Sequence, residues 1–324
     1  MNPAEAARQH DAPHPVRTGK SGKSEKSEKS GKSGLMRDVG LVAGFDLRES
    51  LRTRRALVLV LLYLLIAASA SGIYVRIVAE IQSGVATISG ATAGDAEAVA
   101  GLAMVQDEGY RMLLLFFAGG DTALAEHLGT YPPMVLIYAW VSLAFLPWFI
   151  ALTSYDLIAG DLYLRTIRYA ALRTSRGAYV LGKLLGQAAL VAAVTGLGAL
   201  PVIVIGAIYL PGFDLVATML ALLSTWPITV LCALSFLGVV TLASQLCKGP
   251  GAARAVAVGL LFLVWIFALL PTPIDTLEIF SPWYWKFGLF HPAIGERLLA
   301  IGACLGLCAG YTGLGYLRFR GRDL

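Results

Sequence analysis

The long apolar segments of this 324-residue chain lack ionisable side chains at their centres. The chain's few histidines also lie outside these segments; they are His10, His14, His127 and His291. Carriers driven by protons or sodium ions keep ionisable partners inside the bilayer, and intramembrane enzymes need such groups too. The hydrolase patterns HExxH and GxSxG do not occur. These absences argue against an enzyme and give little support to ion coupling.

Charged residues of both signs are scarce, since 15% of the residues are charged and 57% are hydrophobic. A soluble domain normally carries about 25% charged residues. The net charge of +5 does not indicate nucleic-acid binding, because the basic residues lie beside the apolar segments. The composition predicts a polytopic membrane protein whose surroundings include membrane lipid and no nucleic acid.

Cysteine is also rare, and each example lies in or at the end of an apolar segment: Cys232, Cys247, Cys304 and Cys308. Cys304 and Cys308 are one helical turn apart, but no histidine or acidic residue accompanies them. A metal site needs such further ligands, so we interpret the cysteines as small packing side chains. We expect no metal on this chain.

The apolar segments are long enough to cross a bilayer as helices, since about 20 residues at 1.5 Å each span its roughly 30 Å core. The predicted spans cover residues 56–75, 134–153, 179–210, 215–246, 255–270 and 298–316. The predicted fold class is therefore an all-α polytopic membrane protein with six transmembrane helices. Pro201 predicts a kink within the third span.

The loop over residues 76–132 is acidic, with seven acids against two bases and a balance of −5. These residues are Glu80, Asp95, Glu97, Asp107, Glu108, Asp121 and Glu126, against Arg76 and Arg111. Basic clusters lie before the first span, after the second and fourth spans, and after the sixth. Lys and Arg favour the cytoplasmic side of a membrane. We therefore predict an external loop over 76–132, both termini in the cytoplasm, and a multi-pass protein of the plasma (inner) membrane.

Two segments before the first span differ in character. Residues 1–34 are basic and carry few apolar residues, with Met1 and Val16 as the only large ones, which predicts a disordered tail ahead of a domain over 35–324. Between Met36 and Arg55, apolar residues such as Val39 and Val42 form a stripe among arginines. This pattern predicts an N-terminal elbow helix that lies in the membrane interface.

The stretch from Pro271 to Gly295 is rich in aromatic residues and proline. Aromatic residues at this density favour the headgroup level of a bilayer. We therefore predict a re-entrant segment of one or two short helices before the last span.

The segment from Ser154 to Lys183 combines basic and acidic residues between the second and third spans. Leu157, Asp161 and Leu164 begin a helical spacing that continues to Leu172, so one face of this loop is partly apolar. A charged amphipathic helix on the cytoplasmic side of a membrane protein is suited to docking a soluble partner.

The same loop carries four short features in a fixed order: Asp161, Thr166-Ile167, Thr174-Ser175-Arg176 and Gly182-Lys183. In this order they resemble the first intracellular loop in permease subunits of ABC-2-type (exporter-type) ABC transporters. There an acidic residue precedes a Gly-Thr-Leu-like triplet, a Pro-x-Ser-Arg-like stretch and Gly-Lys. Arg165 stands where the family triplet has glycine, and the family proline is not in place. The six-span layout extends the resemblance from about Leu41 to the C-terminus.

The resemblance implies a six-span permease domain over 35–324, with a coupling helix in this loop that docks on a separate ATP-binding-cassette ATPase subunit. It also implies a second permease subunit, as a homodimer or heterodimer, with ATP and magnesium held by the ATPase and no cofactor on this chain. The implied ATPase-coupling residues are Asp156, Asp161, Leu164, Arg165, Thr166, Arg168, Leu172, Arg173, Ser175, Arg176 and Lys183. Two alternatives stay open: a membrane scaffold that docks a soluble partner, and an ion-coupled or passive carrier.

The individual charges of the loop allow more than one interpretation. Asp156 and Asp161 either pair with Arg165 or Arg168, or are ordinary acids at a helix N-terminus, where the helix dipole favours them. Lys183 is expected to extend to the level of the lipid phosphates. Its sequence context approaches a phosphate-binding loop but lacks the following Ser or Thr, so nucleotide binding is not expected.

The predicted topology is testable by cysteine-accessibility labelling, because an impermeant reagent reaches only external positions. Single cysteines at Ser89 and Ala123 should react in intact cells, while those at Thr174 and Gly251 should react only after permeabilisation. Labelling of position 174 in intact cells would overturn the whole assignment.

Overall fold

The computed structural model describes residues 24–91, 108–167, 173–210, 212–269 and 277–322, and within these residues it is helical without strands. The longer helices are α1 (Ser24–Arg52), α2 (Arg55–Ala91), α5 (Pro133–Ser154), α8 (Arg176–Leu197), α9 (Ala199–Tyr209), α10 (Leu215–Leu246), α11 (Pro250–Leu269) and α13 (Ile294–Arg320). The short ones are α4 (Thr122–Leu128), α6 (Ala159–Tyr163), η1 (Glu278–Phe280) and α12 (Pro282–Phe290). Residues 108–117 are also helical.

Six helical stretches in the described chain are long and apolar enough to cross a membrane. They are Ala56–Glu80, Pro133–Tyr163, Arg176–Tyr209, Leu215–Leu246, Pro250–Ala268 and Ile294–Arg320. Each falls on one of the predicted apolar segments, so the prediction of an all-α, six-span protein is confirmed. Helix α2 continues to Ala91, so it extends into the loop that the sequence predicts from residue 76.

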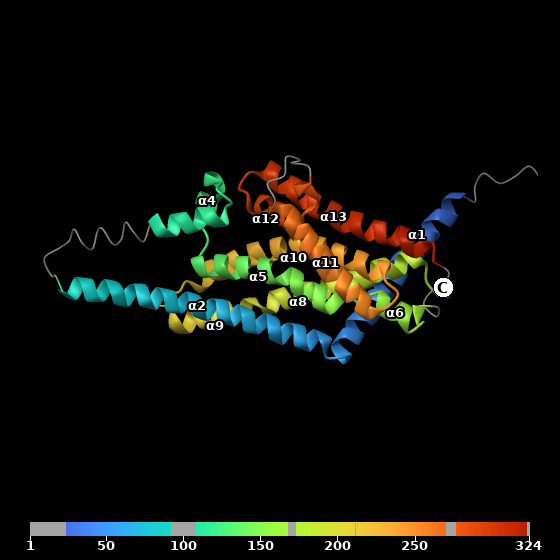
Figure 1. Ribbon diagram of the computed structural model, residues 1–324, viewed down its shortest axis with the longest axis horizontal. Helices are drawn as coiled ribbons and strands as arrows, with labels where there is room; N and C mark the ends of the chain where they lie inside the picture. Colours follow the sequence, from blue (N-terminus) through green and yellow to red (C-terminus); the bar gives the residue numbers. More distant parts are fainter. Residues whose placement is uncertain (1–23, 92–107, 168–172, 211, 270–276, 323–324) are drawn as a thin grey trace, which may run out of the picture.

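Helix α10 lies at the centre of the bundle and packs against α13, α5, α11 and α8. Figure 1 shows α13 along one side of the bundle and α2 along the other, with α5 and α10 between them. Helices α4 and α12 lie toward one end, while α6 and the C-terminus lie at the opposite end. The loop that follows the second span is thus placed beside the end of the chain.

Small residues allow α10 and α13 to approach closely. A Cβ atom added to Gly238 would lie 2.8 Å from the Cα of Cys308, which no real side chain tolerates without movement. Helices pack this closely in membranes where glycine, alanine or serine faces the neighbour. All four cysteines are buried with free thiols, and Cys308 takes part in this close contact.

The third span is interrupted at one residue. Helix α8 ends at Leu197 and α9 begins at Ala199, with Gly198 between them. The ring of Tyr63 in α2 lies so close to Gly198 that a side chain there would not fit. Pro201 is in the first turn of α9, where its missing N–H costs no intrahelical hydrogen bond. The break therefore occurs near the predicted kink, just before the proline.

Helix α1 begins at Ser24, inside the segment predicted to be a disordered tail, and residues 1–23 lie outside the described part. Its apolar stripe is divided between two sides. Val39 is buried against α8, whereas Leu41 and Phe45 are exposed. The helix predicted to lie in the interface is thus packed along one side on the third span.

The segment before the last span contains the short helices η1 and α12, both packed against neighbouring helices. Trp283 is buried against Phe236 of α10, with ring centroids 4.4 Å apart. Some of the aromatic residues expected at the headgroup level therefore fill the core of the bundle. Residues 270–276, which belong to the predicted re-entrant segment, lie outside the described residues.

The Gly238 contact generates a stability prediction. Gly238→Ala should destabilise the purified protein by about 1–3 kcal/mol, because the added methyl group meets the backbone of Cys308. Gly306→Ala on α13 is the matched control, since a Cβ there meets nothing within 4 Å. Thermal unfolding in detergent measures both, and equal midpoints for the two variants would contradict this packing.

Candidate functional site

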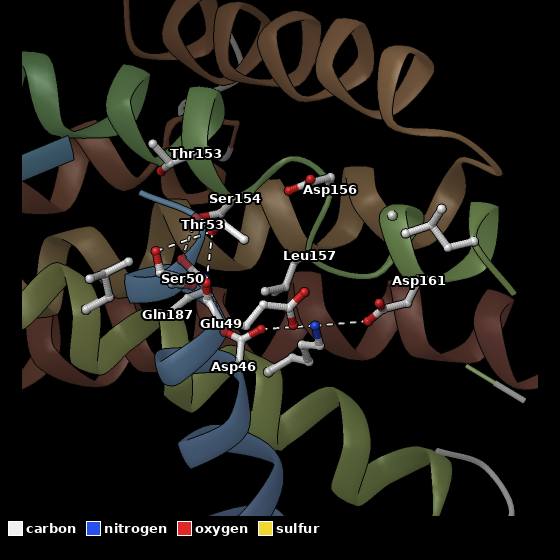
Figure 2. A pocket seen from close by; sticks show the side chains of 14 residues that line it. Asp46, Glu49, Ser50, Thr53, Thr153, Ser154, Asp156, Leu157, Asp161 and Gln187 are labelled. Atoms are coloured by element: carbon white, nitrogen blue, oxygen red, sulfur yellow. Dashed lines mark hydrogen bonds and ion pairs between the residues drawn. The ribbon is translucent and has the colours of Figure 1, made fainter. Parts of the chain in front are cut away.

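A buried cluster of charges forms where α1, α6 and α8 meet (Figure 2). The Lys183 Nζ atom lies 3.0 Å from Asp46 Oδ1 and 2.9 Å from Asp161 Oδ2. The side chains of Lys183 and Asp46 are 10% and 6% exposed, and that of Asp161 is 22% exposed. One lysine of the third span thus joins the N-terminal helix to the loop that follows the second span.

Neutral polar groups complete the surroundings of Asp46. Gln187 Nε2 donates hydrogen bonds to Asp46 Oδ2 at 3.1 Å and to Ser50 Oγ at 3.4 Å. Ser154 Oγ, at the end of α5, donates to Gln187 Oε1 at 3.1 Å. Both carboxylate oxygens of Asp46 are therefore engaged, which is what a buried charge requires. The same network connects α1 and α8 with the second span.

Asp161 has two further partners. Thr166 Oγ1 donates to Asp161 Oδ1 at 3.0 Å, and the Tyr179 hydroxyl donates to Asp161 Oδ2. The side chain of Asp161 therefore closes the turn after α6 and fastens it to the beginning of the third span. Removing Lys183 alone would leave two carboxylates without a positive partner, which typically costs about 3–5 kcal/mol for a buried pair.

Two glycines allow α1 to reach this position on α8. A Cβ on Gly182 would lie 2.6 Å from the Cβ of Val42, and one on Gly186 would lie 3.0 Å from the carbonyl oxygen of Ala43. Because these residues have no side chain, the two helices approach closely on either side of Lys183. This close contact brings Asp46 within ion-pair distance of the lysine.

A small polar cavity of about 100 Å³ borders the cluster, with Glu49 and Asp156 on its wall beside Asp46 and Asp161. It has room for water molecules between these carboxylates. Across the described residues, no group of three or more His, Cys, Asp or Glu side chains is placed to hold a metal ion. The arrangement is thus an ion cluster beside a small polar cavity.

The backbone of the loop is held by α10. Ser244 Oγ accepts hydrogen bonds from the N–H groups of Ile158 at 2.9 Å and Ala159 at 3.0 Å. Leu157, Ile158 and Ile167 pack into one buried cluster with residues of α8 and α13. The base of the loop is therefore fixed to three spans by buried contacts.

The described residues on the outer side of the loop are exposed. Tyr163 and Leu164 are 66% and 68% exposed, and Arg165 and Arg173 are also exposed. Arg165 has φ +59°, the left-handed conformation that favours glycine. The chain therefore turns at Arg165 in a conformation that glycine adopts more readily.

Other implied coupling residues hold helix ends. Ser175 is the N-cap of α8, where its Oγ accepts from the N–H of Ala178 at 3.2 Å. Arg176 Nη1 donates to the carbonyl oxygens of Arg320 at 2.7 Å and Arg322 at 3.1 Å. Ser175 thus caps the start of the third span, and Arg176 ties that start to the end of the sixth span.

The structure therefore sorts the predicted residues into groups. Asp161, Thr166 and Lys183 come together, and Asp156 lines the adjoining cavity. Ser175 and Arg176 are structural, whereas Leu164, Arg165 and Arg173 are on the exposed side. Arg168 and Leu172 lie outside the described residues.

Three expectations need correction. Lys183 does not extend to the lipid phosphates, because two carboxylates hold its ammonium group in a buried position. Asp161 pairs with Lys183 and not with Arg165. The loop does not continue as one helix from Leu157, because α6 ends at Tyr163 and the chain turns at Arg165.

Sequence reasoning missed Asp46, Ser154, Tyr179, Gln187 and Ser244. A signal for Asp46 was present in the sequence, because it falls on the same side of α1 as Val39 and Val42. The paired glycines around Lys183 also indicated that another helix covers it. No sequence pattern indicated that this helix was α1.

These features define a six-span helical membrane protein with a firmly anchored loop whose tip is exposed. A model of the ABC-2 family transporter proteins matches residues 41–324, which include Asp46, the loop and all six spans. The chain therefore belongs to the ABC-2 family of transporter proteins, whose members are membrane components of transport. No curated protein matches this sequence significantly.

A double-mutant cycle tests the ion cluster. Lys183→Met should lower the thermal stability strongly, because it leaves Asp46 and Asp161 buried without their cation. The stability effects of substitutions at contacting residues are not additive. Adding Asp46→Asn should therefore recover about 1–3 kcal/mol of the free energy of unfolding that Lys183→Met removes. Thermal unfolding in detergent provides the measurement, and the exposed Lys248→Met is the control. Strictly additive losses would show that the two charges do not interact.

Proposed function

We propose that this chain is the non-catalytic permease subunit of an ATP-binding-cassette exporter, with ATP and magnesium bound by a separate ATPase subunit. The observation that carries this proposal is the combination of an exposed tip and a rigid base in the loop over residues 154–183. Membership of the ABC-2 family supports association with an ABC ATPase in general.

The tip has the properties of a docking surface. Tyr163 and Leu164 present apolar area, and Arg165 and Arg173 surround it with positive charge. Apolar anchors ringed by charges are typical of protein interfaces, where the charges steer association and fix orientation. The tip is complementary to a protein partner whose surface has an apolar groove with an acidic rim.

The base of the loop has the properties of a mechanical link. A displacement of α6 acts on α10 through Ser244 and on α8 through Asp161 and Lys183. Through the same lysine it acts on α1 at Asp46. ATP-driven movement of the partner would therefore tilt several spans together, which alternating access requires. The second permease subunit would complete the pathway by facing this chain.

The alternatives receive less support. An ion-coupled carrier needs its ionisable site within the bilayer core. The charged cluster is instead near one end of the bundle, since Lys183 is only seven residues from the start of the third span. A membrane scaffold would present the same exposed tip. The permease and scaffold functions are therefore distinguished by whether the chain stimulates ATP hydrolysis and transport. With this function, the basic loop and both termini are cytoplasmic in the plasma membrane.

The docking role is tested by changing the tip alone. The double variant Leu164→Asp, Arg173→Glu should reduce co-purification with the cognate ATPase at least tenfold and abolish the ATPase stimulation. The loss of one apolar anchor and one rim charge is expected to cost about 2 kcal/mol or more. Protein level should stay normal because both side chains are exposed.

Glu126→Lys is the matched control, since it reverses an exposed charge on α4 near the other end of the bundle. It should leave co-purification unchanged. Normal ATPase association by the tip variant would mean that the loop is only a connector.

A further inference from the structure

A second cavity, of about 440 Å³, opens on the side of the bundle near the end opposite to the ion cluster. Its walls come from α5, from α12 and from the helical residues 108–117. They consist of apolar side chains with one charged group, and the main ones are Phe116, Phe117, Trp140, Phe145, Phe287 and Lys286. A volume between about 300 and 1,000 Å³ is ordinary for a ligand site.

The aromatic rings form one continuous wall. Phe117 stacks on Trp140 with centroids 5.1 Å apart and planes 11° from parallel. Trp140 in turn contacts Phe287 at 5.7 Å. Because the rings come from three separate parts of the chain, the wall is a consequence of the fold and not of one amphipathic helix.

Among the described residues that line this cavity, Lys286 supplies the only positive charge. Its Nζ atom lies 4.9 Å from the ring centre of Trp140 and 4.7 Å from that of Phe287. Among the described residues, no carboxylate is within ion-pair distance of Lys286, and the nearby Asp121 faces His291. Burial lowers the pKa of the Lys286 ammonium group, because the surrounding rings solvate charge less well than water does. The rings offset this cost in part through cation–π attraction.

The open side of the cavity faces the surroundings of the spans. Phe116 and Phe145, which also line it, are 78% and 47% exposed, and exposed apolar side chains of this kind are suited to contact with an apolar medium. Trp140 is seven residues from the start of α5, roughly 10 Å along the helix axis at 1.5 Å per residue. Trp140 therefore lies in the first quarter of the candidate span Pro133–Tyr163. Tryptophan and lysine side chains are enriched near span ends, where they contact lipid headgroups.

We infer that this cavity binds an anionic phospholipid of the bilayer, with its headgroup phosphate beside Lys286 and one acyl chain along the aromatic wall. Charge complementarity selects the headgroup, since Lys286 has no acidic partner in the described chain. A choline headgroup carries its own cation, which competes with Lys286 for the faces of Trp140 and Phe287. The site therefore prefers phosphatidylglycerol to phosphatidylcholine.

Brominated lipids test this site on the wild-type protein, because bromine on an acyl chain quenches tryptophan fluorescence only at short range. In mixed micelles, dibrominated phosphatidylglycerol should quench Trp140 at about fivefold lower mole fraction than dibrominated phosphatidylcholine. The Trp140 contribution is obtained by subtracting the signal of Trp140→Phe. Equal quenching by the two lipids would overturn the inference without any variant of Lys286.

The role of the charge is tested separately. Lys286→Gln should abolish the preference for phosphatidylglycerol, and Lys286→Arg should keep it, while Lys248→Gln serves as the matched control at an exposed lysine. A preference that survives in Lys286→Gln would overturn the assignment of the headgroup. Inorganic phosphate at millimolar concentration should not displace the brominated lipid. Displacement by phosphate would instead identify a site for free anions.

Discussion

The ion pair of Lys183 with Asp46 and Asp161 is the constraint on which the arrangement of the described part of the 154–183 loop depends. An ammonium group in an apolar bundle needs negative partners, and here the two partners come from elements more than a hundred residues apart in the chain. Satisfying the lysine fixes α1 on one side of the third span and α6 on the other. Gly182 and Gly186 allow α1 to approach α8 closely. Gln187 donates to the second carboxylate oxygen of Asp46 and accepts a hydrogen bond from Ser154.

In the described part of the bundle, the buried Lys183 and the half-buried Lys286 are held by different means. Lys183 has two carboxylates and a complete polar environment, so its interactions are satisfied within the chain. Lys286 has aromatic faces in place of carboxylates in the described structure, so its charge is available to a ligand. The first arrangement suits a permanent joint between helices, and the second suits a surface that interacts with the medium around the protein.

The sequence was sufficient for the number and position of the spans, because long apolar runs without charges have few alternatives. It also identified Asp161, Thr166 and Lys183 as parts of one region through their order along the loop. It did not predict the contacts of Lys183, because Asp46 reaches it through tertiary packing of α1, and periodicity within one helix carries no information on its neighbour. The turn at Arg165 was missed for a related reason: arginine does not favour the left-handed conformation, so the residue type itself did not indicate a turn there.

The single-residue break at Gly198 divides the third span into two rods of unequal length, α8 with 22 residues and α9 with 11. The longer rod carries Lys183 and therefore follows any displacement of the loop, whereas the shorter rod packs on α2 and α10. Pro201 has no N–H to donate to the Leu197 carbonyl, so the intrahelical ladder is interrupted at this joint. The half of the span beyond Gly198 is therefore held by its own contacts with α2 and α10, whereas the half that carries Lys183 is held by α1 and the loop.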